Sequence, residues 1–253
     1  MTSHVKTPLS LLALLVGGSL LAQSAMAAIS LDRTRIVFNG AEKSQSLTVG
    51  NQNKQLPYLA QGWIEDEQGN KIQSPLTVLP PVQRIEAGGQ SQIKIQALPA
   101  ANLLAQDRES LFYFNLREIP PKSDKPNTLQ IALQTRIKLF YRPASIVPTQ
   151  AQMAAPWQEK LTLTKQGDSY QVNNPTPYYI TLVDAGNKAG VEGIKGFEPV
   201  MVPPKGQAPL GVRTSMLGSN PVLTYINDYG GRPQLKFNCS GTQCTASPVK
   251  EPK

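Results

Sequence analysis

The chain has 253 residues and a formal net charge of +8, with its lysines and arginines dispersed rather than gathered in a run. A basic chain is able to bind nucleic acid, but the dispersed charge argues against that partner, and we expect no nucleic acid. The only histidine is His4, which lies in a segment that we expect to be removed. Histidine triads, histidine general bases and imidazole metal sites are therefore excluded from the mature chain.

The N-terminal segment is typical of a secretory signal peptide. Lys6 precedes an apolar run over residues 9–21, and Ala25-Met26-Ala27 follows as a cleavage site. The run is too short to cross ~30 Å of hydrocarbon, and no later stretch reaches the ~20 apolar residues that a spanning helix needs. We expect cleavage after Ala27 to remove residues 1–27, leaving an exported chain with no membrane insertion.

Short segments of alternating apolar and polar residues follow, bounded by proline, glycine, asparagine and aspartate. A period of two is typical of β-strands, and we expect at most one helical turn, over residues 100–106. The strands predicted before residue 142 cover residues 29–31, 43–49, 58–65, 91–98, 111–119 and 128–141.

The alternation stops after Tyr141, where Pro143 and Pro148 enclose a short, stiff linker over residues 143–148. Each half of the chain has the roughly seven short strands of an immunoglobulin-like sandwich. The sequence therefore predicts an all-β fold with two immunoglobulin-like β-sandwich domains in tandem, over residues 28–142 and 149–253. The strands predicted for the second domain cover residues 157–163, 170–173, 178–183, 200–202, 210–212, 222–226 and 235–239.

The sequence contains no convincing catalytic pattern. A Ser-x-x-Lys motif at Ser91 and Lys94 lies in an alternating segment, where an odd offset places the two side chains on opposite faces. The acidic run from Glu65 to Glu67 precedes Gly69 and fits a hairpin tip. We therefore expect a protein that is not an enzyme, with no catalytic residue and no cofactor.

Cys239 and Cys244 are the only cysteines. An even pair in an exported chain most often forms a disulfide. A redox or metal site is the alternative, but two thiols without histidine provide too few ligands for zinc, and the spacing is not C-x-x-C. We expect a structural disulfide and no metal site.

Residues 128–141 form the longest predicted strand, in which Leu129, Ile131 and Leu133 alternate with Gln130, Ala132 and Gln134. One interpretation is an ordinary half-buried strand, and the other is an edge strand whose apolar row binds a partner. The periodicity does not separate the two interpretations.

Residues 104–121, with the sequence LAQDRESLFYFNLREIPP, resemble the signature of the periplasmic chaperones of pilus (fimbrial) subunits. The resemblance covers nearly all of the mature chain. It implies a periplasmic protein with two partners, the pilus subunits and the outer-membrane usher that receives them. It also implies donor-strand complementation, in which Leu129, Ile131 and Leu133 fill a groove of an incomplete subunit. An exported adhesin or structural sandwich module is the alternative from a different class.

The resemblance assigns roles to further residues. Arg35 and Lys138 match a pair that grips the C-terminal carboxylate of the subunit, and an adhesin is expected to lack this pair. Lys138 has the opposite parity to Leu129, so a twist, a bulge or a position facing the cleft must reconcile the anchor with the apolar row. The remaining assignments are interdomain ion pairs at Glu109, Arg142 and Asp228, an usher surface at Val82, Arg84, Ile93 and Lys94, and the disulfide Cys239–Cys244.

Overall fold

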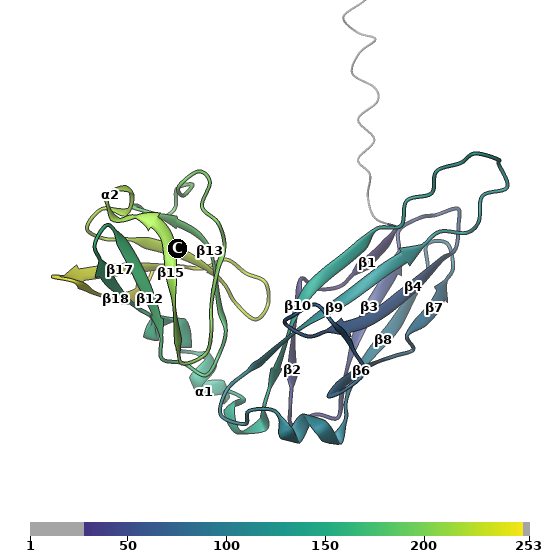
Figure 1. Ribbon diagram of the computed structural model, residues 1–253, viewed down its shortest axis with the longest axis horizontal. Helices are drawn as coiled ribbons and strands as arrows, with labels where there is room; N and C mark the ends of the chain where they lie inside the picture. The colour runs from purple at the N-terminus through teal and green to yellow at the C-terminus, as the bar shows by residue number, and fades with distance from the viewer. Residues whose placement is uncertain (1–27, 250–253) are drawn as a thin grey trace, which may run out of the picture.

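The computed structural model describes residues 28–249, so the predicted signal peptide lies outside the described residues. Two β-sheet bodies lie side by side, with the short helix α1 (Gln150–Met153) near the junction (Figure 1). One apolar core gathers side chains from Ile29 to Tyr141, and a second gathers side chains from Leu161 to Cys244. The expected all-β fold with two sandwiches is confirmed, while the exact domain and linker boundaries stay predictions.

The first sandwich consists of two sheets that enclose the first core. One has the strand order β1-β3-β8-β6, and the other has the order β2-β10-β9-β4-β5 with β7 paired to β4. All its strand pairs are antiparallel except β2 with β10, which is parallel. The bounds are β1 (Ile29–Leu31), β2 (Arg35–Asn39), β3 (Ser44–Asn51), β4 (Tyr58–Glu65), β5 (Lys71–Ile72), β6 (Leu76–Leu79), β7 (Val82–Ile85), β8 (Gln90–Ala97), β9 (Ser110–Ile119) and β10 (Gln134–Arg142).

The second sandwich is one hydrogen-bonded path of strands around the second core, in the order β14-β13-β16-β17-β18-β11-β12-β15. The hairpin of β17 and β18 is closed by the disulfide between Cys239 and Cys244, which are register partners. The predicted disulfide is therefore confirmed. The bounds are β11 (Thr162–Gln166), β12 (Ser169–Asn174), β13 (Ile180–Gly186), β14 (Val200–Val202), β15 (Gly206–Arg213), β16 (Val222–Ile226), β17 (Gln234–Ser240) and β18 (Gln243–Pro248).

Helical structure is limited to single turns. The expected turn over residues 100–106 is present as η1 (Pro99–Leu103), and the other turns of the described residues are η2 (Ala144–Ile146), α1, η3 (Trp157–Lys160) and α2 (Thr214–Leu217). The strand predicted over residues 157–163 is wrong in its first part, because η3 occupies that part. Pro156 has the fixed φ that suits the start of a turn, and the amide of Leu161 closes it on the Gln158 carbonyl.

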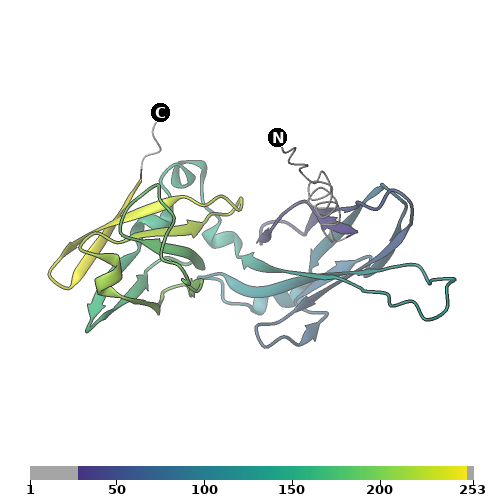
Figure 2. The ribbon, with the colours of Figure 1, turned by 90° about the horizontal axis from the view of Figure 1, so that it is seen from above.

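The strand predicted over residues 128–141 is also wrong in its first part. β10 begins only at Gln134, and residues 120–133 extend away from the sandwich as a long loop (Figure 2). The last ladder contact is the Glu118 amide donating to the Leu133 carbonyl at 3.0 Å. β9 ends at Ile119, and Pro120 and Pro121 follow without any amide N–H to continue the ladder.

Candidate functional site

β10 has one edge that is only partly paired. Its antiparallel partner β9 pairs with it from Gln134 to Tyr141, whereas its parallel partner β2 begins at Arg35, opposite Lys138. Within residues 28–249, no strand pairs with that second edge of β10 before Lys138. Unpaired backbone N–H and C=O groups on such an edge are a template for a strand of another chain.

The segment that leads into this edge carries an exposed apolar row. Leu129 is 86% exposed, Ile131 is 67% exposed and Leu133 is 39% exposed. The same parity continues into Ile137 and Leu139, which pack in the first core. The row therefore has the same parity as the core-facing residues of β10. It lies beyond the end of the first core, so that core does not bury it.

Arg35 and Lys138 are neighbours across β2 and β10 and both point toward the second sandwich. Arg35 Nη1 donates to the Ile226 carbonyl at 3.2 Å, and Lys138 Nζ donates to Thr181 Oγ1 at 3.3 Å. Burial lowers the pKa of Lys138, and the nearby charge of Arg35 lowers it further. Among the described residues, no carboxylate forms an ion pair with either cation.

Lys138 and the apolar row have opposite parity along one segment, and the structure shows how both are accommodated. The pairing of β10 with β9 runs without a register shift from Gln134 to Tyr141, so no bulge is present there. Leu139 is completely buried in the first core, whereas Lys138 contacts Thr181 of the second sandwich. Lys138 therefore has the opposite parity to the apolar row, which lies before β10 begins, and the cation lies on the face of β10 toward the second sandwich.

Arg142, the last residue of β10, connects the two sandwiches. Its guanidinium forms ion pairs with Glu109 Oε1 at 2.7 Å and with Asp228 Oδ2 at 2.8 Å, so the structure brings together the three residues expected to pair. The Tyr179 amide donates to Glu109 Oε2 at 2.7 Å. Burial raises the pKa of Glu109 to about 7, although the charge of Arg142 acts in the opposite direction.

Two aromatic side chains of this junction were not found by sequence reasoning. The Arg142 guanidinium lies 4.7 Å from the ring centre of Tyr178 and 5.2 Å from that of Trp157, and the two rings are 4.5 Å apart. Trp157 was placed in a predicted strand, and nothing in the local pattern indicates a cation above it. The sequence signal is limited to the presence of aromatic residues in the second half of the chain.

Three of the four residues expected to contact the usher are exposed, and one is not. Val82 and Arg84 are exposed on β7, and Lys94 is exposed on β8, which belongs to the other sheet. Ile93 is completely buried in the first core, so its assignment to a surface is wrong. Alternation on β8 sends Ile93 inward and Lys94 outward. Sequence reasoning missed Leu59, an exposed residue of β4 that pairs with Arg84.

Residues 28–249 lack two further features. They contain no helix that is long and apolar enough to span a membrane. They also contain no group of three or more His, Cys, Asp or Glu side chains placed to hold a metal ion.

The site thus combines two β-sandwiches, a strand edge that is only partly paired, and two cations that form no ion pair within residues 28–249. The chain matches the family model of the pili and flagellar-assembly chaperone PapD N-terminal domain over residues 28–147. It matches the model of the pili assembly chaperone PapD C-terminal domain over residues 156–237. The protein therefore belongs to the PapD family of pilus assembly chaperones, and both halves have the immunoglobulin-like fold of that family.

Individual relatives agree with this assignment. The probable fimbrial chaperone YfcS of Escherichia coli K12 is 54% identical over 233 residues, which cover 92% of this chain and 90% of that protein. Chaperone protein PapD of Escherichia coli is 52% identical over 227 residues, covering 88% of this chain and 92% of PapD. Among solved structures, the periplasmic chaperone SfaE superposes with a TM-score of 0.64 at 32% identity, covering 82% of this chain and 98% of SfaE.

A second solved structure contains a bound partner. A complex of the Salmonella enterica SafA pilin with the SafB chaperone matches with a TM-score of 0.66 at 25% identity, covering 88% of this chain and 97% of the matched chain. In that complex a chaperone with a similar fold is joined to a pilin.

Proposed function

We propose that this protein is a periplasmic chaperone that captures pilus subunits by donor-strand complementation. The observation that carries the proposal is the free edge of β10, which is continuous with the exposed row of Leu129, Ile131 and Leu133. A subunit that lacks one strand of its own sandwich has a groove of matching chemistry. Residues 128–137 would add to that groove as a strand and fill it with the apolar row.

The energetics of such a capture favour a broad range of subunits. Each apolar side chain that becomes buried contributes about 1.5–3 kcal/mol before the cost of association. The main-chain hydrogen bonds of an added strand depend little on the sequence of the partner. A chaperone that serves several subunits needs this combination of strength and tolerance.

Arg35 and Lys138 would bind the terminal carboxylate of the subunit. A carboxylate accepts paired hydrogen bonds from an arginine fork and attracts the point charge of a lysine. The strand that joins β10 must end where β2 begins, because β2 occupies the edge from Lys138 onward. The anchor would therefore fix the register, since a slip of one residue would turn every side chain to the wrong face.

The outer-membrane usher is the second partner that we propose. An exposed apolar group on the outer face of the six-stranded sheet, Leu59 and Val82, lies beside Arg84. It lies on a different strand from the free edge of β10, so both partners could bind at once. We propose this surface, without Ile93, as the contact with the usher.

The test is co-expression in the periplasm with candidate pilus subunits, followed by pull-down of the chaperone. The wild-type chain should recover subunit, whereas Lys138→Ala and Ile131→Ser should recover at least tenfold less while remaining folded by circular dichroism. Lys165→Ala, an exposed lysine on β11 of the second sandwich, is the matched control and should behave as wild type. Normal subunit recovery by both Lys138→Ala and Ile131→Ser would refute the proposal.

A further inference from the structure

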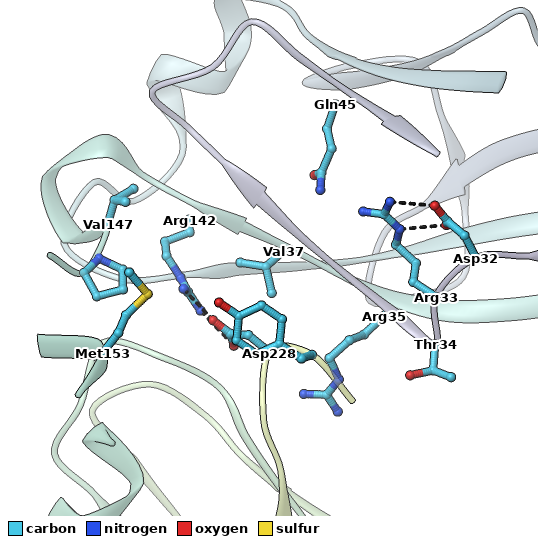
Figure 3. Close-up of a pocket in the computed structure, with 12 residues that line it drawn as sticks. Asp32, Arg33, Thr34, Arg35, Val37, Gln45, Arg142, Val147, Met153 and Asp228 are labelled. Carbon is cyan, nitrogen blue, oxygen red and sulfur yellow. Dashed lines mark hydrogen bonds and ion pairs between the residues drawn. The ribbon is translucent and has the colours of Figure 1, made fainter. Parts of the chain in front are cut away.

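A cavity of about 430 Å³ opens at the junction of the two sandwiches, directly beside Arg35 (Figure 3). Its walls come from both sides of the junction. Arg35 and Val37 belong to β2, and Val147, Met153 and Tyr229 belong to the linker, α1 and the turn between β16 and β17. The cavity is therefore assembled only when the sandwiches are packed together.

The charges around this cavity are already paired, with one exception. Arg33 forms an ion pair with Asp32 at 2.8 Å, and Arg142 forms one with Asp228 at 2.8 Å (Figure 3). Within the described part of the chain, Arg35 has no carboxylate partner, and one of its N–H groups binds the Ile226 carbonyl. Among the described cations that line the cavity, Arg35 is thus the one without an ion pair, and it is itself only 8% exposed.

The rest of the wall is suited to an apolar group. Val37, Val147, Pro148 and Met153 present aliphatic or thioether surface, and Tyr229 also lines the cavity. Tyr229 is 89% exposed, which is unusual for a large aromatic side chain without a partner. Its ring is available to cover a group that enters the cavity.

One free cation beside an apolar cavity is complementary to a carboxylate that carries a bulky apolar substituent. The last residue of a polypeptide chain has this chemistry. We infer that the cavity is a specificity pocket for the side chain at the carboxyl end of the captured strand, and that it favours large apolar or aromatic residues over glycine, alanine or charged residues.

This inference rests on the proposed function, because it uses Arg35 as the group that binds the carboxylate. It adds a requirement on the last side chain of the captured strand to the requirement for a terminal carboxylate. The anchor alone would accept any chain end, since every polypeptide has a terminal carboxylate. A pocket beside the anchor would let the chaperone discriminate between chain ends, and the contact of Tyr229, Met153 and Val147 would be made only by ends that fill it.

Synthetic peptides test the inference directly. A set of peptides would share one alternating apolar sequence and a free carboxyl end, and would differ only in the last residue, which is Phe, Leu, Ala or Lys. We expect the wild-type chain to bind the Phe and Leu peptides roughly tenfold more tightly than the Ala peptide, and the Lys peptide no better than the Ala peptide. Isothermal titration or fluorescence anisotropy measures these affinities.

Two variants separate the pocket from the anchor. Tyr229→Ala removes the exposed ring, and Val37→Phe fills the cavity from β2. Both should reduce the tenfold preference to less than threefold, with little change in affinity for the Ala peptide. Leu103→Ala removes an equally exposed apolar side chain from η1, 88% exposed, and should leave the preference unchanged.

Failure of the pocket and failure of the proposed function give different results. If the wild-type chain binds none of the peptides and captures no subunit, the proposed function fails. If it binds all four peptides equally, and Lys138→Ala abolishes that binding, the anchor stands and the pocket is refuted. An unchanged preference in both Tyr229→Ala and Val37→Phe would also refute the pocket.

Discussion

Leu129 and Leu139 belong to one alternating segment and have the same parity, yet their environments are opposite. Leu139 is completely buried between neighbours of the first core, and Leu129 is 86% exposed. The difference is the number of partner strands. Leu139 lies between two partner strands, β9 on one side and β2 on the other. Leu129 has no partner strand, because the pairing with β9 begins only at Gln134.

This contrast shows that one sequence pattern can serve two purposes along a single segment. The later part of the segment completes the core of its own sandwich, while the earlier part presents the same kind of side chains to the exterior. If the earlier part completes the core of a partner, as we propose, the free chaperone exposes apolar side chains that become buried in the core of that partner. Substitutions at the two ends should then have separable effects on stability and on capture.

The largest loss of stability is expected for a substitution at Arg142, the last residue of β10. At pH 8, above the pKa of about 7 for Glu109, Arg142→Ala would leave a buried carboxylate without its counter-ion, and breaking a buried pair in this way typically costs about 3–5 kcal/mol. Urea denaturation measures the free energy of unfolding. Arg136→Ala is the matched control on the same strand, because its ion pair with Glu65 is partly exposed and should contribute under ~1 kcal/mol. Equal losses for both variants would contradict a special role for the junction.

Leu139→Ala is expected to cause the second-largest loss of stability. Removing a completely buried leucine side chain costs about 2–5 kcal/mol through lost burial and the cavity that remains. The same denaturation experiment applies, with a lower midpoint and an unchanged slope as the expected result. A loss below 1 kcal/mol would mean that β10 is not a stable part of the first core in solution.

A dependence on pH should arise from Glu109, the buried partner of Arg142. Burial raises the pKa of this carboxyl group from its ordinary value of 4.5 to about 7, against the opposing effect of Arg142. The folded protein therefore binds this proton more tightly than the unfolded chain. The resulting stability is fully present below pH 4.5 and is lost as the pH rises through 7, by at most about 3 kcal/mol.

Unfolding free energies at pH 5 and pH 8 would measure this effect in the wild-type chain and in Glu109→Gln. The wild-type chain should lose more stability between the two pH values than the variant, because glutamine does not titrate. Identical pH dependence in both proteins would show that Glu109 does not bind a proton in this range.

The smallest effect on stability is expected at the exposed end of the segment. Leu129→Ala should change the free energy of unfolding by less than ~0.5 kcal/mol, because the side chain has almost no contacts to lose. Recovery of subunit in the co-expression experiment should nevertheless fall. A substantial loss of stability would mean that the row is covered within its own monomer, which would remove the basis of the proposed capture.

Much of this architecture could be predicted from local sequence. A period of two indicated strands in both halves, and the parity of Lys138 relative to Leu129 indicated that the cation and the apolar row face opposite ways. The cysteine pair in an exported chain predicted the disulfide, and the signature over residues 104–121 indicated the family. Each of these inferences depends on neighbouring residues, on composition or on a contiguous motif, and such information is present in the chain before it folds.

Other features were decided only by tertiary contacts. A strand exists only where a second strand completes its hydrogen bonds, so the start of β10 at Gln134 depended on where β9 ends and on Pro120 and Pro121. The burial of Ile93, the two tilted rings beside Arg142 and the cavity beside Arg35 likewise depended on how separate elements pack. Hydrogen-bond partners and packing neighbours come from distant parts of the chain, and local periodicity carries no information about them.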